Sequence, residues 1–262
     1  MTLRFAMPLI LRALTALVVC AIAPAGVHAA TYLNRTRVII AEPAREASLQ
    51  LVNAGVQPVL FQIWIDTGDA AAAPEQLDVP FFVDAPVFRL DQGHSKQLRI
   101  LSESSRQQLP QDRESMFWLN ALEVPATPSR DAPHRVQFAF QSRIKLFYRP
   151  KALQAPQAEG FDASMAQLQF LLRCEGPDST LEIDNGSPYH HTLLQATLLR
   201  NGHAIAVAEP DPGLLLPMSK TSIALPSSRD RGTVSITVRY TLMNDFGVAV
   251  EKQKPLSNAS CK

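Results

Sequence analysis

Short runs of alternating or β-branched apolar residues recur along the chain beyond residue 30. Proline, glycine, aspartate and serine separate these runs, a pattern typical of strands joined by turns. The predicted strands of the first half are Arg37–Ile40, Ser48–Val52, Val59–Ile65, Phe81–Val83, Val87–Leu90, Gln97–Leu101, Ser115–Val124 and Val136–Tyr148. The second half adds Leu168–Leu172, Thr180–Asp184, Thr192–Arg200, Ala204–Ala208, Thr221–Leu225, Thr233–Tyr240 and Val248–Lys252. No long stretch keeps a helical period, and only Glu103–Leu109 is expected to form a single helical turn.

Two successive series of short strands predict an all-β protein built from two immunoglobulin-like β-sandwich domains. The segment 151–159 separates the two series and offers no apolar face. We therefore predict an N-terminal domain over residues 30–150, a linker over 151–159 and a C-terminal domain over 160–262. Asn201-Gly202, between two predicted strands, is the strongest hairpin signal in the sequence.

Residues 1–29 have the features of a cleaved export signal. Arg4 and Arg12 supply positive charge, Ala13–Ala23 is apolar, and Val27-His28-Ala29 is a small-residue cleavage pattern. The alternative is a transmembrane anchor, which needs about 20 apolar residues, more than this run supplies. We therefore expect export and a mature chain that is not inserted in a membrane.

Composition and charge exclude several classes of function. The 262 residues carry 25 basic and 24 acidic side chains, and 46% of them are hydrophobic, which is typical of a globular protein. A net charge of +1 does not favour a nucleic-acid-binding surface, because such a surface needs clustered Lys and Arg. The sequence has no phosphate-binding glycine loop, zinc-binding helix motif or nucleophile elbow. We expect no catalytic activity, no cofactor and no metal.

A few acidic and histidine residues were candidates for chemistry. Asp66 and Asp69 lie in a turn-like segment and are expected to be solvated loop carboxylates. His190 and His191 are adjacent at the start of a predicted strand, so their rings should point to opposite faces. This geometry does not favour a shared ligand.

Two cysteines, Cys174 and Cys261, remain once residues 1–29 are removed. In an oxidising compartment two cysteines most simply form one disulfide. The alternative is a pair of buried free thiols. Metal binding is not expected, because no histidine has ligand spacing around either cysteine.

Three motifs, by their order and spacing, resemble a known protein family. They are Asn34-Arg35-Thr36-Arg37-Val38-Ile39, the segment Leu109–Asn120 (LPQDRESMFWLN) running on to Val124-Pro125, and Ile144–Pro150 (IKLFYRP). In these motifs the chain is similar to the periplasmic pilus-assembly chaperones of chaperone–usher systems, the PapD-like family. Further similarity in Val87–Ile100, Asn185–Tyr189 and Asn244–Gly247 extends the resemblance over essentially the whole mature chain. One departure is Asp91-Gln92-Gly93, where the family commonly has a proline before the glycine.

The resemblance implies a periplasmic chaperone whose two sandwiches are set at an angle, in a boomerang shape. Glu114, Arg149 and Asp245 would form the interdomain ion network that fixes this angle, although exposed ion pairs often contribute little. The partners would be pilin or fimbrial subunits and an outer-membrane usher, and the free chaperone could cap its own strand as a dimer. The short loop Pro125–His134 resembles the short-loop type of the family. The alternative function is a secreted two-domain binding or adhesion module, which would share the fold.

The resemblance also implies roles for two groups of residues. Val136, Phe138 and Phe140 would lie on the donor strand that completes a subunit lacking its last strand, a known form of strand addition. The pattern alone favours the alternative that these residues line their own core. Arg37 and Lys145 would bind the C-terminal carboxylate of the subunit. The alternative for this pair is two solvated surface cations.

Overall fold

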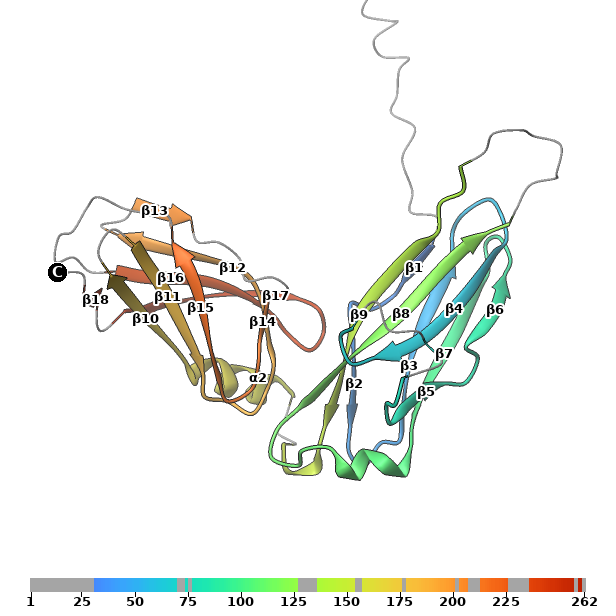
Figure 1. Cartoon of the computed structure of the whole chain (residues 1–262), viewed down its shortest axis with the longest axis horizontal. Coiled ribbons are helices and arrows are strands. Elements are labelled where there is room, and N and C mark those ends of the chain that lie inside the picture. The colour runs from blue at the N-terminus through green and yellow to red at the C-terminus, as the bar shows by residue number, and fades with distance from the viewer. Residues whose placement is uncertain are drawn as a thin grey trace, which may run out of the picture.

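The computed structural model describes residues 31–69, 74, 77–126, 136–153, 157–175, 178–200, 203–206, 213–225, 236–256 and 259–260. The described strands form two lobes that meet at an angle (Figure 1). Each lobe contains two sheets packed around its own apolar core. The predicted all-β fold with two immunoglobulin-like sandwiches is confirmed.

The N-terminal lobe has a four-stranded and a five-stranded sheet. The first has the order β1-β3-β7-β5, formed by Thr31–Leu33, Glu46–Asn53, Ser95–Ser102 and Phe81–Val83. The second has the order β2-β9-β8-β4-β6, formed by Arg37–Ala41, Phe140–Arg149, Ser115–Pro125, Val59–Asp66 and Val87–Leu90. Alternate side chains of each strand point inward, and those with no exposed surface include Ile40, Leu98, Leu119, Leu146 and Tyr148. This core fixes β2, β8 and β9, the strands that carry the expected site.

The C-terminal lobe has the same two-layer construction. One sheet has the order β15-β11-β10-β18, formed by Ser219–Leu225, Asp178–Asn185, Leu168–Glu175 and Ala259–Ser260. The other has the order β13-β12-β16-β17, formed by His203–Ala206, His191–Arg200, Ile236–Met243 and Ala249–Pro255, with β14 (Leu214–Leu215) pairing to β12. Leu168, Leu181, Ile183, Val238 and Leu242 are completely buried between them.

The strand expected to carry the donor residues begins later than its sequence pattern predicts. The predicted strand starts at Val136, whereas β9 starts at Phe140. The pairing of β9 with β8 ends at Phe140 and Glu123. Two positions further on, β8 ends at Pro125, which has no backbone N–H to donate to a neighbouring strand. Residues 136–139 therefore extend past the ladder.

A helix lies where the sequence predicts a linker. Lys151–Leu153 form a short 3₁₀ helix, and α2 spans Gln157–Ala166, so the end of the expected 151–159 linker is helical. The sequence pattern does not indicate this helix because α2 has little apolar periodicity. Its contact with the C-terminal core comes from Phe161 and Met165, four residues apart on one helix face. The single helical turn expected near Glu103 is present as a 3₁₀ helix over Ser104–Gln108.

Several expectations concern residues that the structure does not describe. Residues 1–29, the Asn201-Gly202 hairpin and most of the Pro125–His134 loop lie outside the described residues. Within the described part of the chain, no helix is both long and apolar enough to cross a membrane.

Candidate functional site

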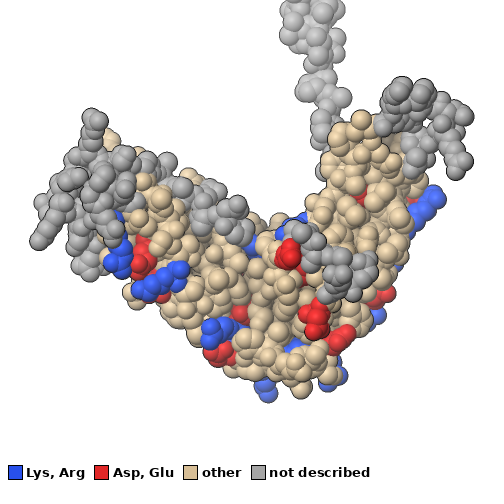
Figure 2. All heavy atoms as spheres, in the orientation of Figure 1, with Lys and Arg blue, Asp and Glu red and all other residues tan. Residues whose placement is uncertain are grey.

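The expected functional residues lie on the side of the N-terminal lobe that faces the C-terminal lobe, where β2 and β9 approach it (Figure 1). The space-filling view shows a hollow between the two lobes, with basic and acidic side chains interspersed over the visible face (Figure 2). The interface between the lobes is polar: Glu114 N–H donates to the Pro188 carbonyl at 2.9 Å.

The first half of β9 has one backbone edge without a neighbour among the described strands. On one side, β8 pairs with β9 from Phe140 onward. On the other side, β2 runs parallel to β9 and pairs with it only from Lys145, opposite Arg37. Residues 140–144 therefore have N–H and C=O groups on the β2 side that no described strand pairs with, in line with the start of β2. A free edge of this kind is a template for another strand.

Three exposed apolar side chains lie in this stretch and in the four residues before it. Val136 is 79% exposed, Phe138 67% and Phe140 62%. They alternate along the chain, as residues on one face of an extended segment do. The alternative that they line the core of their own sandwich is wrong, because all three are exposed.

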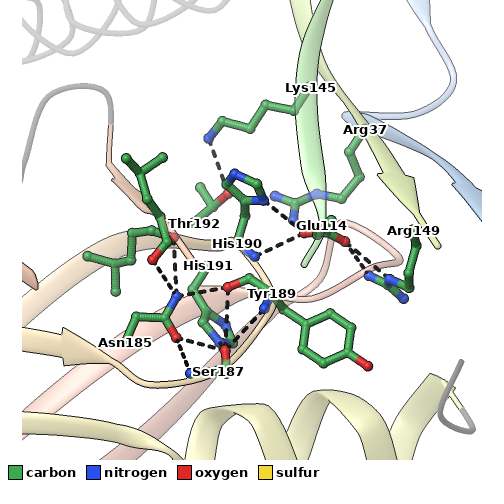
Figure 3. Close-up of polar contacts among 12 residues, drawn as sticks. Arg37, Glu114, Lys145, Arg149, Asn185, Ser187, Tyr189, His190, His191 and Thr192 are labelled. Atoms are coloured by element: carbon green, nitrogen blue, oxygen red, sulfur yellow. Dashed lines mark hydrogen bonds and ion pairs between the residues drawn. The ribbon is translucent and has the colours of Figure 1, made fainter. Parts of the chain in front are cut away.

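Arg37 and Lys145 form a buried cation pair (Figure 3). They are register partners on β2 and β9, and each is less than a tenth exposed, so the alternative of two solvated surface cations is wrong. Lys145 Nζ donates to Thr192 Oγ1 at 3.1 Å, and Arg37 Nη1 donates to the Met243 carbonyl at 3.2 Å. Both acceptors belong to the C-terminal lobe and neither carries a charge.

The positive charges of Arg37 and Lys145 are not balanced by a nearby carboxylate among the described residues. Burial and the adjacent charge of Arg37 lower the pKa of Lys145 from 10.5 to about 8. Burial also lowers the pKa of Arg37, while the charges of Asp245 and Glu114 act in the opposite direction. Within the described residues, Arg37 Nε has no hydrogen-bond acceptor, and no carboxylate lies within ion-pair distance of either cation. The geometry is suited to bind an anion.

Glu114, Arg149 and Asp245 lie in contact between the lobes. Arg149 Nη2 is 2.8 Å from Glu114 Oε1, and Arg149 Nη1 is 2.8 Å from Asp245 Oδ2. Glu114 also accepts a hydrogen bond from the backbone N–H of His190 at 2.9 Å. Burial would raise the pKa of Glu114, but the His190 hydrogen bond and the Arg149 charge lower it overall. The network therefore joins β9 to β12 and to the turn after β16.

Two family descriptions match nearly the whole described chain. Residues 30–154 match "Pili and flagellar-assembly chaperone, PapD N-terminal domain", and residues 163–254 match "Pili assembly chaperone PapD, C-terminal domain". The chain belongs to the PapD-like pilus-assembly chaperone family.

Curated relatives and solved structures agree with this assignment. The chaperone is 35% identical over 249 residues to chaperone protein FimB/FhaD of Bordetella pertussis, covering 94% of this chain and 96% of the relative. It is 34% identical over 222 residues to the probable fimbrial chaperone YadV of Escherichia coli, covering 84% and 87%. The crystal structure of YadV chaperone matches with a TM-score of 0.71 and 30% identity, covering 87% of this chain and 100% of that one. The protein is thus a pilus-subunit chaperone, and its family is one of chaperones rather than enzymes.

Asp66 corrects one sequence expectation. It is the last residue of β4 and 1% exposed, rather than a solvated loop carboxylate. Asp66 Oδ1 is 2.7 Å from Arg143 Nη2, and Asp66 Oδ2 accepts a hydrogen bond from Asn120 Nδ2 at 2.7 Å. The Arg143 guanidinium lies 4.8 Å above the Trp118 ring. This buried network ties β9 to β8 and β4 just beside the free edge.

The disulfide between Cys174 and Cys261 stays a prediction. Cys261 and the side chain of Cys174 lie outside the described residues. The residues just before them, Arg173 and Ser260, are register partners in the parallel pairing of β10 with β18. Among the described residues, no group of three or more His, Cys, Asp or Glu could hold a metal ion.

Sequence reasoning missed the contribution of the C-terminal lobe to the cation pair. Thr192 and Met243 are register partners on β12 and β16, and both contact the pair. No sequence pattern marks either residue. The sequence singles out His190 only as the neighbour of His191, with which it is not expected to share a ligand. Nδ1 of His190 lies 3.1 Å from Glu114 Oε2, whereas Nε2 of His191 lies 3.3 Å from Ser187 Oγ.

Proposed function

We propose that this chaperone acts in the periplasm, binds pilin-type subunits that lack their last strand, and delivers them to an outer-membrane usher. The observation that carries the proposal is the buried cation pair Arg37 and Lys145, which has no carboxylate partner among the described residues and lies where β2 leaves the first half of β9 unpaired. We call this pair the carboxylate clamp, because the C-terminal carboxylate is a group that every client subunit has.

The free edge of β9 supplies the strand. An incomplete subunit has unpaired backbone groups and an open apolar groove. An added extended segment pairs with the backbone groups and fills the groove with its alternate side chains. Val136, Phe138 and Phe140 are exposed on alternate positions and fit such a groove. Each of these side chains would contribute roughly 1.5–3 kcal/mol on burial, before ordering costs are subtracted.

The position of β2 dictates the direction of the client strand. A strand that pairs with residues 140–144 lies in line with β2, which begins at Arg37 opposite Lys145. The client C-terminus meets the clamp only if its strand runs parallel to β9. The carboxylate then accepts charge-assisted hydrogen bonds from Arg37 and Lys145, which set the register of the pairing.

Subunit release needs no nucleotide. The N-terminal extension of another subunit would replace the donated strand in a better-packed register. The same exposed segment supports a self-capping dimer of the free chaperone, because an apolar strand edge is sticky until it is covered. Removal of residues 1–29 on export would place the mature chain in the compartment where it meets its clients.

Affinity capture from the periplasm of the native host tests the proposal. Tagged wild-type chaperone is compared with Arg37→Ala/Lys145→Ala and with a control, Arg89→Ala/Lys220→Ala, whose side chains are 68% and 59% exposed. Mass spectrometry should identify pilin-type subunits with the wild type and the control but not with the clamp variant. Equal recovery with all three proteins would overturn the clamp, and no pilin with any of them would overturn client binding.

A further inference from the structure

The turn between β16 and β17 presents two exposed apolar side chains beside the carboxylate clamp. Phe246 is 70% exposed and Val248 is 56% exposed. We propose that this turn, Asn244–Val248, here named the cleft turn, is a second contact for the client subunit. Phe246 packs against the C-terminal segment that the clamp holds. This contact presupposes the proposed function and adds a binding surface on the C-terminal lobe.

The cleft turn lies against the start of β2. Gly247 has a φ of +78°, and a Cβ atom there would lie 2.6 Å from Thr36 Oγ1, so the turn backbone touches the residue before Arg37. Arg37 in turn donates to the carbonyl of Met243, which directly precedes the turn. Figure 1 shows the end of the β16–β17 hairpin directed toward β2 and β9. A client chain that ends at Arg37 therefore ends beside the cleft turn.

Hydrogen bonds and an ion pair hold the cleft turn in one conformation. Asn244 Oδ1 accepts hydrogen bonds from the backbone N–H groups of Phe246 at 3.0 Å and Val248 at 2.9 Å. Gly247 N–H donates to the Asn244 carbonyl at 3.0 Å. Asp245 is paired with Arg149 of the N-terminal lobe. An aromatic side chain on a fixed turn loses little conformational freedom when a partner covers it, which favours binding.

The groups around the turn indicate that the partner which covers it is the client subunit. The turn adjoins the clamp, so one partner whose carboxylate lies there can cover both surfaces without a gap. Arg37 Nε is buried and has no hydrogen-bond acceptor in the described part of the chain, so a donor beside the turn is available to an acceptor group of the client. Arg149 neutralises Asp245, so the acidic side chain of the turn is already paired, and Phe246 and Val248 are its exposed apolar side chains.

Phe246→Ser, with Phe82→Ser as its matched control, tests the contact. Phe82 lies on β5 in the other sheet of the N-terminal lobe and is 47% exposed. The client identified by periplasmic capture is purified in complex with each variant, and its dissociation constant and the thermal unfolding of each free variant are measured. Phe246→Ser should weaken client binding roughly 10- to 100-fold, as expected for burial of a phenylalanine, and Phe82→Ser should leave it unchanged. Neither Phe246→Ser nor Phe82→Ser should change the melting temperature, because both side chains are exposed.

Three outcomes would count against the cleft turn. Equal client affinity for Phe246→Ser and Phe82→Ser would remove the contact. A melting temperature that falls only in Phe246→Ser would make the side chain a support between the lobes instead. Loss of pilus assembly in cells with unchanged client affinity would assign the turn to the usher or to a second copy. Arg37→Ala/Lys145→Ala is assayed beside these variants: if it binds the client fully, the clamp fails independently of the turn.

Discussion

Client binding should weaken as pH rises through 8. The pKa of Lys145 in the free chaperone is about 8, because the side chain is buried next to Arg37. A bound carboxylate favours the protonated lysine, so the pKa of Lys145 rises in the complex. Above pH 8 the free chaperone must therefore take up a proton in order to bind its client.

The size of the effect follows from the protonated fraction of Lys145. With a pKa of about 8, this fraction is roughly 0.9 at pH 7 and roughly 0.1 at pH 9. The dissociation constant should therefore rise about tenfold between these pH values. Isothermal titration with a peptide of the client C-terminal strand measures it directly, because the α-carboxylate stays ionised throughout the range. Lys145→Arg is the matched control, since arginine does not titrate below about pH 12.

Two results would refute this account. A wild-type affinity that is flat from pH 7 to 9 would show that Lys145 does not lose its proton there. An equal slope in Lys145→Arg would assign the titration to another group.

The folding stability of the free chaperone should rise with pH, whereas its affinity for the client should fall. Its lysine pKa is lowered from 10.5 to about 8, so the unfolded state binds more protons between these values, and stability rises with pH across that window.

Three further predictions concern the buried networks and the donor segment. Glu114→Ala leaves Arg149 with only one of its two acidic partners and should lower the free energy of unfolding by about 3–5 kcal/mol in urea denaturation; a loss below about 1 kcal/mol would contradict a buried network. Asp66→Ala removes the partner of Arg143 and should cost about 1–3 kcal/mol, because Arg143 is 26% exposed and stays partly solvated, whereas loss of a solvated carboxylate would cost almost nothing. Phe138→Asp should abolish client capture while the melting temperature stays unchanged, because the side chain is 67% exposed; a drop in melting temperature would instead place it in a core.

Strand positions could be predicted well because a sandwich core requires strict alternation. The predicted strand Val87–Leu90 coincides with β6, and Val59–Ile65 differs from β4 by one residue. Here local pattern and tertiary burial depend on the same physical fact, that every second side chain meets the opposite sheet.

Features that depend on distant contacts could not be predicted. Asp66 looks solvated in its local segment, and its partner Arg143 lies 77 positions away, so the sequence pattern contains no sign of the buried pair. The helix α2 contributes few apolar side chains, and Phe161 and Met165 become informative only once the core they cover is known. Arg37 and Lys145 were assigned through family resemblance, because buried unpaired cations run against the usual preference of these residues for solvent.

Strand β9 also fixes the distances between the residues proposed to contact the client. Phe140, Lys145 and Arg149 lie on one continuous strand, so the exposed aromatic side chain, the proposed clamp and the ion network between the lobes keep fixed separations. Lys145 lies five positions after Phe140, a span of about 17 Å in an extended strand. With its carboxylate held by the proposed clamp, a client would have to present its groove at this distance from its own C-terminus. One added residue at that terminus would shift the pairing by one position and turn every facing side chain to the wrong side.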